Sequence, residues 1–224
     1  MAEPFFSVIV PAHNCAQYMR RGLDSIKNQG FTDYELIIVC DACEDNTEEI
    51  AREYTDKVYV VNYHWPGPTR SVGLDHATGK WILWMDDDDW YLPNAFQQIA
   101  DAIVQNPEAD IIAYGFTWDG VGKTLQSPKR LLVAVWTKAW RRDFIGDVRF
   151  PDHFCAEDLE FGRILHPKAK FAYLPQVLYF YNFLRKDSFS DKLRHDSWEQ
   201  PLNNDLKNYQ AWLQKNYMDF KGEV

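Results

Sequence analysis

Carboxylate side chains gather at three points of the chain, each beside a predicted strand or helix. Asp41 follows one apolar run, the segment from Asp86 to Asp89 follows another, and Glu157-Asp158 opens a later helical pattern. In an open α/β sheet, ligands collect at the carboxyl ends of the strands. The pattern therefore predicts that acidic groups from distant parts of the chain meet in one site.

The run from Asp86 to Asp89 is the strongest chemical signal. Four adjacent carboxylates repel one another, and a bound divalent cation would relieve that repulsion. A solvated acidic turn that caps the next helix is the alternative. The flanking residues are large and apolar: Trp84, Met85, Trp90 and Leu92. This setting favours a metal site, and hard oxygen ligands suit Mg²⁺ or Mn²⁺.

Short β-branched runs alternate with helical patterns through the first half of the chain, which is typical of a largely parallel sheet with crossover helices. The predicted strands are 5–10, 36–39, 57–61, 81–85 and 111–115, and the predicted helices are 17–28, 45–54, 70–77 and one that begins near Pro93. After Trp118 the expected elements are shorter and rich in aromatic residues. Residues 201–224 form an amphipathic pattern, which predicts a helix docked on the core or on a second subunit, with a membrane surface as the alternative.

Composition limits the class of protein. A chain of 224 residues with 46% hydrophobic content can bury the core of one compact domain. A formal charge of −9 argues against nucleic acid and anionic lipid as partners, because such partners are usually met by a basic face. No basic segment precedes an apolar run, and no stretch approaches the roughly 20 apolar residues that span a bilayer. The expected location is cytoplasmic.

The four cysteines are too few for a disulfide scaffold in a chain of this length and are typical of reduced thiols. Cys40 and Cys43 have the spacing of half a redox or zinc motif, but no second half accompanies them. Packing of small, half-buried thiols after a strand is the favoured interpretation.

Five segments in chain order resemble the family 2 glycosyltransferases. They are Val8-Ile9-Val10-Pro11-Ala12-His13-Asn14, Glu35-Leu36-Ile37-Ile38-Val39-Cys40-Asp41, Arg70, Trp84-Met85-Asp86-Asp87-Asp88-Asp89 and Ala156-Glu157-Asp158. None is decisive alone, but the ordered set is specific and covers about residues 5–190. The segment Trp136-Thr137-Lys138-Ala139-Trp140-Arg141 also resembles one in bacterial members, where a Trp and a Lys precede a short helix.

The resemblance implies an α/β protein of the GT-A fold in a single domain. A Rossmann-like, nucleotide-binding half with a mainly parallel sheet would span 1–115, an acceptor-side half 116–200 and a C-terminal helix 201–224. The implied reaction is inverting, metal-dependent transfer of one sugar from a nucleotide diphosphate sugar, expected to be a UDP-sugar, to a hydroxyl of a glycan, a lipid-linked acceptor or a protein. The Gln-x-x-Arg-Trp signature of processive synthases is absent, which favours a non-processive enzyme of glycan or cell-surface polysaccharide synthesis.

The resemblance also assigns roles at the nucleotide. Pro11, Ala12 and His13 would shape the base-binding edge, and Asp41 would accept a hydrogen bond from the imide of uracil. Arg70 would face the diphosphate, where a guanidinium matches phosphate oxygens. Cys40, Ala42 and Cys43 replace an Asp, a Gly and a Ser that are usual in the family, so this turn departs from the family pattern.

The remaining assignments concern the metal and the catalytic base. Asp88 would bind the metal directly, Asp86 would lie near the ribose or a metal-bound water, and Asp87 would contact the nucleotide. Asp89 is an alternative cap for the next helix. Asp158 would be the general base, with Glu157 as its neighbour. Residues 181–190, with Arg185 and Lys186, resemble the family's mobile segment over the diphosphate, and His195 is a further candidate metal ligand.

Two other classes remain. A sugar nucleotidyltransferase would bind a metal nucleotide on a similar sheet, but the Gly-rich, basic loop that cradles a triphosphate is missing after the first strand. A non-enzymatic carbohydrate- or nucleotide-binding module would use the tryptophans as stacking platforms, but it gives no reason for Asp158 beside the acidic run.

Overall fold

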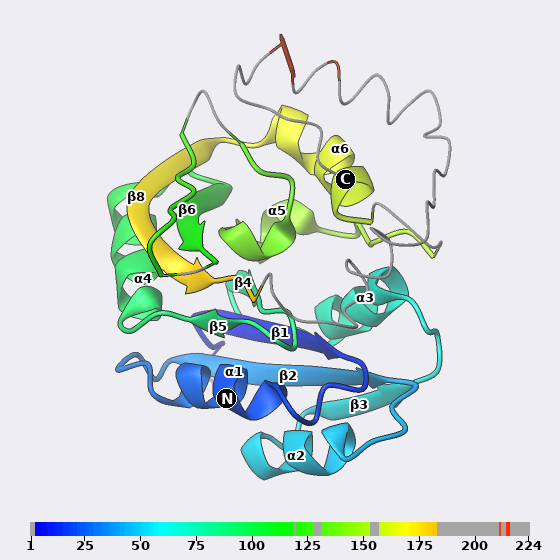
Figure 1. Ribbon diagram of the computed structural model, residues 1–224. Coiled ribbons are helices and arrows are strands. Elements are labelled where there is room, and N and C mark those ends of the chain that lie inside the picture. Colours follow the sequence, from blue (N-terminus) through cyan, green and yellow to red (C-terminus); the bar gives the residue numbers. More distant parts are fainter. Residues whose placement is uncertain are drawn as a thin grey trace.

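One mixed β-sheet organises the protein. The computed structural model describes residues 3–118, 120–127, 131–152 and 157–182, together with Ala211, Gln214 and Lys215. Within this part of the chain, eight strands form a single sheet in the order β3-β2-β1-β4-β7-β6-β8-β5 (Figure 1). The strands are β1 (Phe6–Ala12), β2 (Tyr34–Asp41), β3 (Val58–Val61), β4 (Trp81–Trp84), β5 (Trp90–Tyr91), β6 (Ile111–Thr117), β7 (Lys138–Arg141) and β8 (Phe171–Phe180).

The helices connect the strands as the alternating pattern predicts. They are α1 (Met19–Lys27), α2 (Thr47–Tyr54), α3 (Pro66–His76), α4 (Ala95–Gln105), α5 (Arg142–Ile145) and α6 (Glu157–Leu165), with short 3₁₀ turns η1 (Val135–Thr137) and η2 (His166–Lys168). In α1 the residues Met19, Leu23 and Ile26 are buried, as their spacing predicts. The apolar face expected for α4 is also buried.

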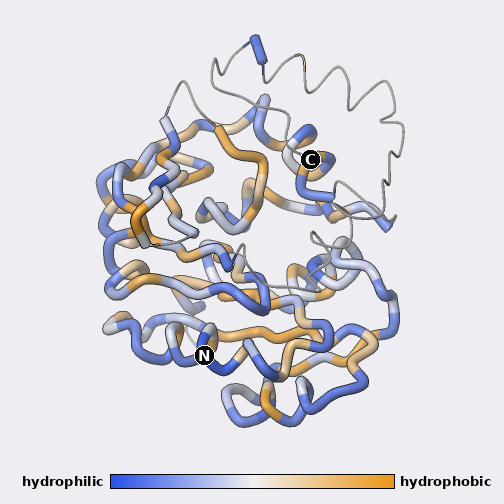
Figure 2. The backbone as a smooth tube through the Cα atoms, viewed as in Figure 1, coloured by the Kyte–Doolittle hydropathy of each residue, from blue (hydrophilic) through white to orange (hydrophobic). Residues whose placement is uncertain are grey.

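The first half of the sheet is parallel. Strand β1 pairs with β2 and β4, and β2 pairs with β3, all in parallel. Every residue of β1 and β4 is buried. Strands of parallel sheets are usually buried on both faces, so they appear in the sequence as nearly continuous apolar runs. Figure 2 shows these strands as a largely hydrophobic centre, with hydrophilic residues concentrated on the surrounding helices and loops.

The second half is mixed, and the sequence patterns describe it less well. Strand β7 pairs antiparallel with β4 and β6, whereas β8 runs parallel to β6 and antiparallel to β5. The expectation of short late elements is wrong for β8, which is the longest of the described strands at ten residues. Its pairing with β6 shifts register around Gly115, which interrupts the regular alternation that identifies a strand.

One predicted helix start is wrong, and one proline lies just outside the helix that it was expected to open. Helix α3 begins at Pro66 rather than at residue 70, because proline is tolerated in the first turn, where its missing N–H has no partner in any case. Helix α4 begins at Ala95, and the preceding Asn94 adopts a left-handed φ of 61°. Pro93 therefore lies before the helix rather than in its first turn.

A buried carboxylate stabilises the edge of the sheet where β2 begins. Glu35 accepts hydrogen bonds from Ser7 Oγ at 2.5 Å and from the backbone N–H of Thr78 at 2.6 Å, and it pairs with Lys57. Burial disfavours its charge, but these donors outweigh burial and lower the pKa of Glu35 to about 2. Asp41 lies at the other end of the same strand.

Between β4 and β5 the chain passes from the middle of the sheet to its edge. Strand β4 lies in the middle of the sheet and β5 at its edge, with residues 85–89 between them. In Figure 1 the curved strand β8 brings this edge back toward the centre. The acidic turn is therefore held between the parallel half and strand β8.

The predicted C-terminal helix at 201–224 lies outside the described residues, apart from Ala211, Gln214 and Lys215. Of the helices that the structure describes, none combines the length and the apolar character needed to cross a bilayer.

Candidate active site

A buried arginine joins the acidic segments. Arg70 of α3 is 5% exposed, and it donates from Nη1 to Glu157 Oε1 at 2.6 Å and from Nη2 to Asp86 Oδ1 at 2.8 Å. Arg70 thereby connects the turn after β4 to the start of α6. Its Nε is buried without a hydrogen-bond partner among the described residues. The predicted contact of Arg70 with a diphosphate stays a prediction, because both terminal nitrogens are paired with carboxylates here.

Asp158 lies beside this ion pair, and its two carboxylate oxygens have different surroundings. Its Oδ2 accepts a hydrogen bond from the N–H of Val135 at 3.1 Å, whereas its Oδ1 is buried and has no partner among the described residues. Burial raises the pKa of Asp158 to about 7; Glu157 and Asp86 add to the increase, and Arg70 opposes it. A carboxylate that titrates near neutral pH is suited to accept a proton during a reaction.

The four carboxylates of the acidic turn have different surroundings. Asp86 binds Arg70, Asp87 Oδ2 accepts the backbone N–H of His13 at 2.9 Å, and Asp88 is half-buried. Asp89 is fully buried and accepts the hydroxyl of Tyr179 at 2.8 Å. The turn is thus tied to three other parts of the chain.

Asp89 is not a helix cap. Asn94, not Asp89, precedes α4, and Asp89 Oδ1 accepts the N–H of Asn182 at 2.7 Å. Burial, together with the charges of Asp88 and Asp86, holds the pKa of Asp89 well above its usual range. Asp89 therefore fastens the turn to the end of strand β8.

The donor set of the turn fits a divalent cation that shares its ligands with a phosphate. Among the residues that the structure describes, no three His, Cys, Asp or Glu side chains form a closed metal cluster. Mg²⁺ is commonly held by one or two carboxylates together with substrate phosphates rather than by an all-protein cage. Asp86 and Asp88 supply hard oxygen atoms of this kind.

The predicted base-binding edge lies where β1 ends. Pro11 and Ala12 are buried in β1, and His13 is exposed immediately after it. The imidazole Nδ1 of His13 lies 2.6 Å from the carbonyl oxygen of Asp41. Because the backbone of His13 also binds Asp87, this residue connects the end of β2 to the acidic turn.

Asp41 is more heavily bonded than a free base-binding acceptor would be. Its Oδ1 accepts the N–H groups of Tyr63 and His64 at 2.7 and 3.0 Å, and its Oδ2 accepts Trp65 N–H and Thr69 Oγ1 at 3.0 and 2.8 Å. A carboxylate offers about four lone-pair sites. An imide could bind this carboxylate only by replacing one of these donors, so the structure gives Asp41 a positioning role for the loop before α3.

Three residues near the site were not singled out as site residues from the sequence. Tyr179 donates to Asp89, and its ring stacks on Trp136 with the centroids 4.8 Å apart. Lys138 is buried, and burial lowers its pKa to about 7, although the charge of Asp158 opposes that decrease. The Trp-x-Lys pattern marked the segment of Trp136 and Lys138, whereas Tyr179 lies in an aromatic-rich strand that carries no separate signal.

Three predicted site residues, Arg185, Lys186 and His195, lie outside the described residues.

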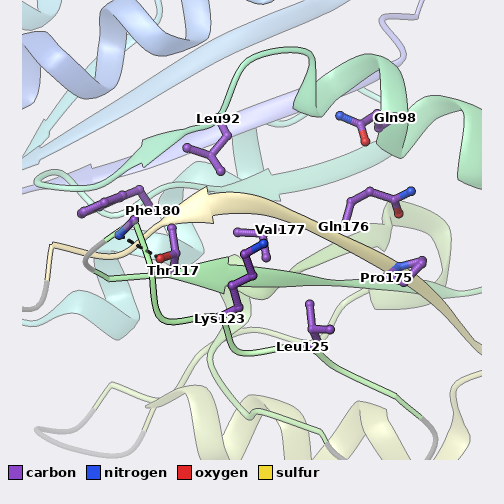
Figure 3. Close-up of a pocket in the computed structure, with 10 residues that line it drawn as sticks. Leu92, Gln98, Thr117, Lys123, Leu125, Pro175, Gln176, Val177 and Phe180 are labelled. Atoms are coloured by element: carbon purple, nitrogen blue, oxygen red, sulfur yellow. Dashed lines mark hydrogen bonds between the residues drawn. The ribbon is translucent and has the colours of Figure 1, made fainter.

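A cavity of about 560 Å³ opens away from these groups. Figure 3 shows it between α4, β8 and the segment after β6, with Gln98, Lys123 and Phe180 among its lining residues. Successive side chains of a strand point to opposite faces, so Phe180 and Tyr179 face different sides of β8. None of the predicted site residues lines this cavity.

The family model described as "Glycosyl transferase family 2" matches residues 7–159. The chain belongs to this family. An uncharacterized glycosyltransferase of Rickettsia prowazekii is 34% identical over 114 residues, which are 50% of this chain and 36% of that protein. The putative glycosyltransferase EpsH of Bacillus subtilis is 31% identical over 132 residues, 57% of this chain and 38% of that protein. The chain spans little more than a third of the length of these curated relatives.

Solved structures of glycosyltransferases share the fold. TarS of S. aureus, crystallised with UDP-GlcNAc, superposes with a TM-score of 0.73 at 24% identity, over 97% of this chain and 68% of that one. The mannosyltransferase PcManGT of Pyrobaculum calidifontis, in complex with GDP-Man and Mn²⁺, gives a TM-score of 0.65 at 16% identity, over 99% of this chain and 66% of that one. The expected α/β architecture of the GT-A type is confirmed.

Proposed function

We propose that this family member transfers a single sugar from a nucleotide diphosphate sugar, in the first place a UDP-sugar, to a hydroxyl group, with inversion at the anomeric carbon and dependence on Mn²⁺ or Mg²⁺. The observation that carries the proposal is Asp158 beside the Arg70–Asp86 ion pair: its Oδ1 has no partner in the described part of the chain, and its pKa is about 7. The proposed acceptor is a glycan, a lipid-linked sugar or a protein.

Asp158 acts as the base in this proposal. Its Oδ1 takes the proton from the acceptor hydroxyl while the hydroxyl oxygen attacks the anomeric carbon. Attack on the face opposite the leaving nucleoside diphosphate inverts the configuration. The Val135 N–H holds Oδ2, which leaves Oδ1 to face the acceptor.

Asp88, with Asp86 beside it, would hold the divalent cation, which when bound neutralises negative charge on the diphosphate. Arg70 fixes Asp86 relative to Glu157 and keeps the base and the acidic turn in one cluster. In the proposal Arg185 and Lys186 add positive charge toward the diphosphate, and His195 is a further ligand candidate.

The base and ribose would lie against Pro11, Ala12 and His13. Asp41 supports this edge by ordering residues 63–69, and Asp87 fixes the backbone of His13. The TarS complex with UDP-GlcNAc supports a UDP-sugar, and the PcManGT complex with GDP-Man and Mn²⁺ supports a metal but shows that a second base is found on this fold.

A nucleotide-sugar panel with and without EDTA tests the proposal. We expect UDP release from at least one UDP-sugar with Mn²⁺ or Mg²⁺ present, and loss of that release with EDTA. UDP affinity by calorimetry should fall in the same way, because only a cation reverses the repulsion between carboxylates and diphosphate. Asp88→Asn should reproduce the effect of EDTA, whereas Asp101→Asn, at an exposed position of α4, should not. Equal UDP affinity with and without EDTA would remove the metal role of Asp88.

A further inference from the structure

Two thiols converge where β1 and β2 end. Cys40 is fully buried in β2, directly opposite Ala12 of β1. Cys43 is half-buried, and its Sγ lies 3.5 Å from the carbonyl oxygen of the same Ala12. Ala42 adopts a left-handed φ of 47°. The backbone turns back at this residue and places Cys43 next to the end of β1. Cys40 and Cys43 therefore both lie beside Ala12, at the end of the two paired strands.

Their environments give the two thiols different reactivity. The neighbouring Cys40 thiol lowers the pKa of Cys43 to about 7; burial opposes this decrease, and Asn14 and His13 support it. The neighbouring Cys43 and burial raise the pKa of Cys40. The thiolate is the reactive form of cysteine, so Cys43 is the nucleophile and Cys40 the adjacent thiol that can resolve it.

A third cysteine provides an internal comparison. Cys15 is fully buried, and burial raises its pKa. Its sulfur accepts the hydroxyl of Thr47 at 3.7 Å. Peroxide reacts with thiolates, so a buried thiol with a raised pKa such as Cys15 should not react with peroxide before Cys43 does.

We propose that Cys40 and Cys43 form a redox-active pair that hydroperoxides convert to an intramolecular disulfide. The Cys43 thiolate attacks one oxygen of hydrogen peroxide, the O–O bond breaks, and the departing hydroxide takes up a proton to leave as water. The Cys40 thiol then attacks the sulfenic sulfur of Cys43, the S–S bond forms, and a second water leaves. Two thiols and one peroxide thus give one disulfide and two waters.

The bridge would act on the proposed nucleotide edge because Asp41 lies between the two cysteines. The Asp41 carboxylate holds the loop at residues 63–65. The backbone carbonyl oxygen of Asp41 contacts the imidazole Nδ1 of His13. A disulfide requires a specific separation and orientation of the two Cβ atoms, so we expect its closure to shift the backbone around Asp41. We expect oxidised protein to bind UDP on the order of tenfold more weakly, a loss of about one hydrogen bond to a charged group.

Peptide mapping tests the bridge without reference to activity. In a Cys155→Ser background, which removes the cysteine outside the described residues, peroxide should remove two hydrogens from the peptide that contains Cys40 and Cys43 and protect both from alkylation. Dithiothreitol should restore both thiols. Cys15→Ser should leave the bridge unchanged, whereas Cys40→Ser should stop Cys43 at the sulfenic acid. Alkylation of both Cys40 and Cys43 after peroxide treatment would overturn the proposal.

UDP titration of reduced and oxidised protein then separates the two proposals. The effect on UDP rests on the proposed function, but the mass measurement does not. If reduced protein binds no UDP, the proposed function fails while the disulfide is still tested by mass. Equal UDP affinity of the reduced and bridged forms would contradict the predicted effect on the nucleotide edge.

Discussion

The hydroxyl of Tyr179 holds Asp89 from across the sheet. It donates to Asp89 Oδ2 at 2.8 Å and accepts the backbone N–H of Asp86 at 3.0 Å. One side chain of β8 thus binds both ends of the acidic turn. The geometry of a candidate metal site in the first half of the chain is therefore set by a strand of the second half.

Tyr179→Phe should weaken both the fold and metal-dependent UDP binding. Removing the hydroxyl takes a hydrogen bond from the buried carboxyl of Asp89 and from Asp86 N–H, at a cost of about 1–3 kcal/mol. Chemical denaturation and UDP titration over a range of Mn²⁺ concentrations measure the two effects. Tyr114→Phe is the matched control, because its buried hydroxyl donates to the carbonyl of Trp136 and does not touch the turn. Equal Mn²⁺ requirements in the two variants would deny Tyr179 a positioning role.

Arg70→Met should be strongly destabilising. It leaves the carboxylates of Asp86 and Glu157 without their cation, and breaking a buried pair in this way costs about 3–5 kcal/mol. Arg70→Lys should recover only part of the loss, because an ammonium cannot reproduce the forked contact. Arg20→Ala is the control: Arg20 and Glu53 are about half exposed, and such surface pairs contribute little to stability. Similar unfolding free energies for Arg70→Met and Arg20→Ala would contradict the linking role.

Asp158 should control the pH profile of transfer. Only the ionised carboxylate accepts a proton, so kcat/KM should rise as the pH passes through about 7. Asp158→Asn should reduce transfer by a factor on the order of 10² or more, while UDP and metal affinity stay near those of the parent. Near-parental transfer by this variant would make Asp158 a helix-start carboxylate and leave Glu157 as the next candidate.

Stability and a neighbouring lysine provide two checks on Asp158. Its folded pKa is raised, so its contribution to stability is lost as the pH rises toward and through about 7. Asp158→Asn should therefore be at least as stable as the parent at pH 8 by thermal melting. Lys138 titrates in the same pH range, near 7. If Asp158 is the base, Lys138→Gln should still show the rise of kcat/KM as the pH passes through about 7.

The amino-acid sequence is sufficient to predict the parallel half of the fold and the grouping of the acidic segments. Continuous apolar runs identify β1, β2 and β4, and the placement of Asp86 and Glu157 around Arg70 agrees with the rule for strand carboxyl ends. These features depend on short-range patterns and on the order of the strands.

The second half was harder to predict because its structure depends on long-range pairing. Strand β5 has two residues and exists through its pairing with β8, and the role of Asp89 depends on Tyr179 and Asn182. The saturation of the Asp41 carboxylate likewise depends on a loop more than twenty residues later. No local pattern contains this information.

Glu35 should make the fold sensitive to acid. Its folded pKa of about 2 lies below the ordinary value of 4.5, so its stabilising effect is present above pH 4.5 and is lost as the pH falls toward 2. The full effect is about 3 kcal/mol. Denaturant titrations from pH 6 to pH 3 should show a steeper loss in the parent than in Glu35→Gln. Glu108→Gln, in an exposed pair with Lys170, is the control and should follow the parent.

The pairing of Trp90 with Phe180 has a consequence for synthesis on the ribosome. The acidic turn is translated about ninety residues before the strand that holds it, a delay of roughly 5–20 s at ordinary elongation rates. During that interval the emerging chain contains the parallel strands but neither Tyr179 nor Asn182, which hold Asp89. A nascent chain therefore cannot order the acidic turn until translation has passed β8, and the pairing that completes the described sheet also fixes the candidate metal ligands.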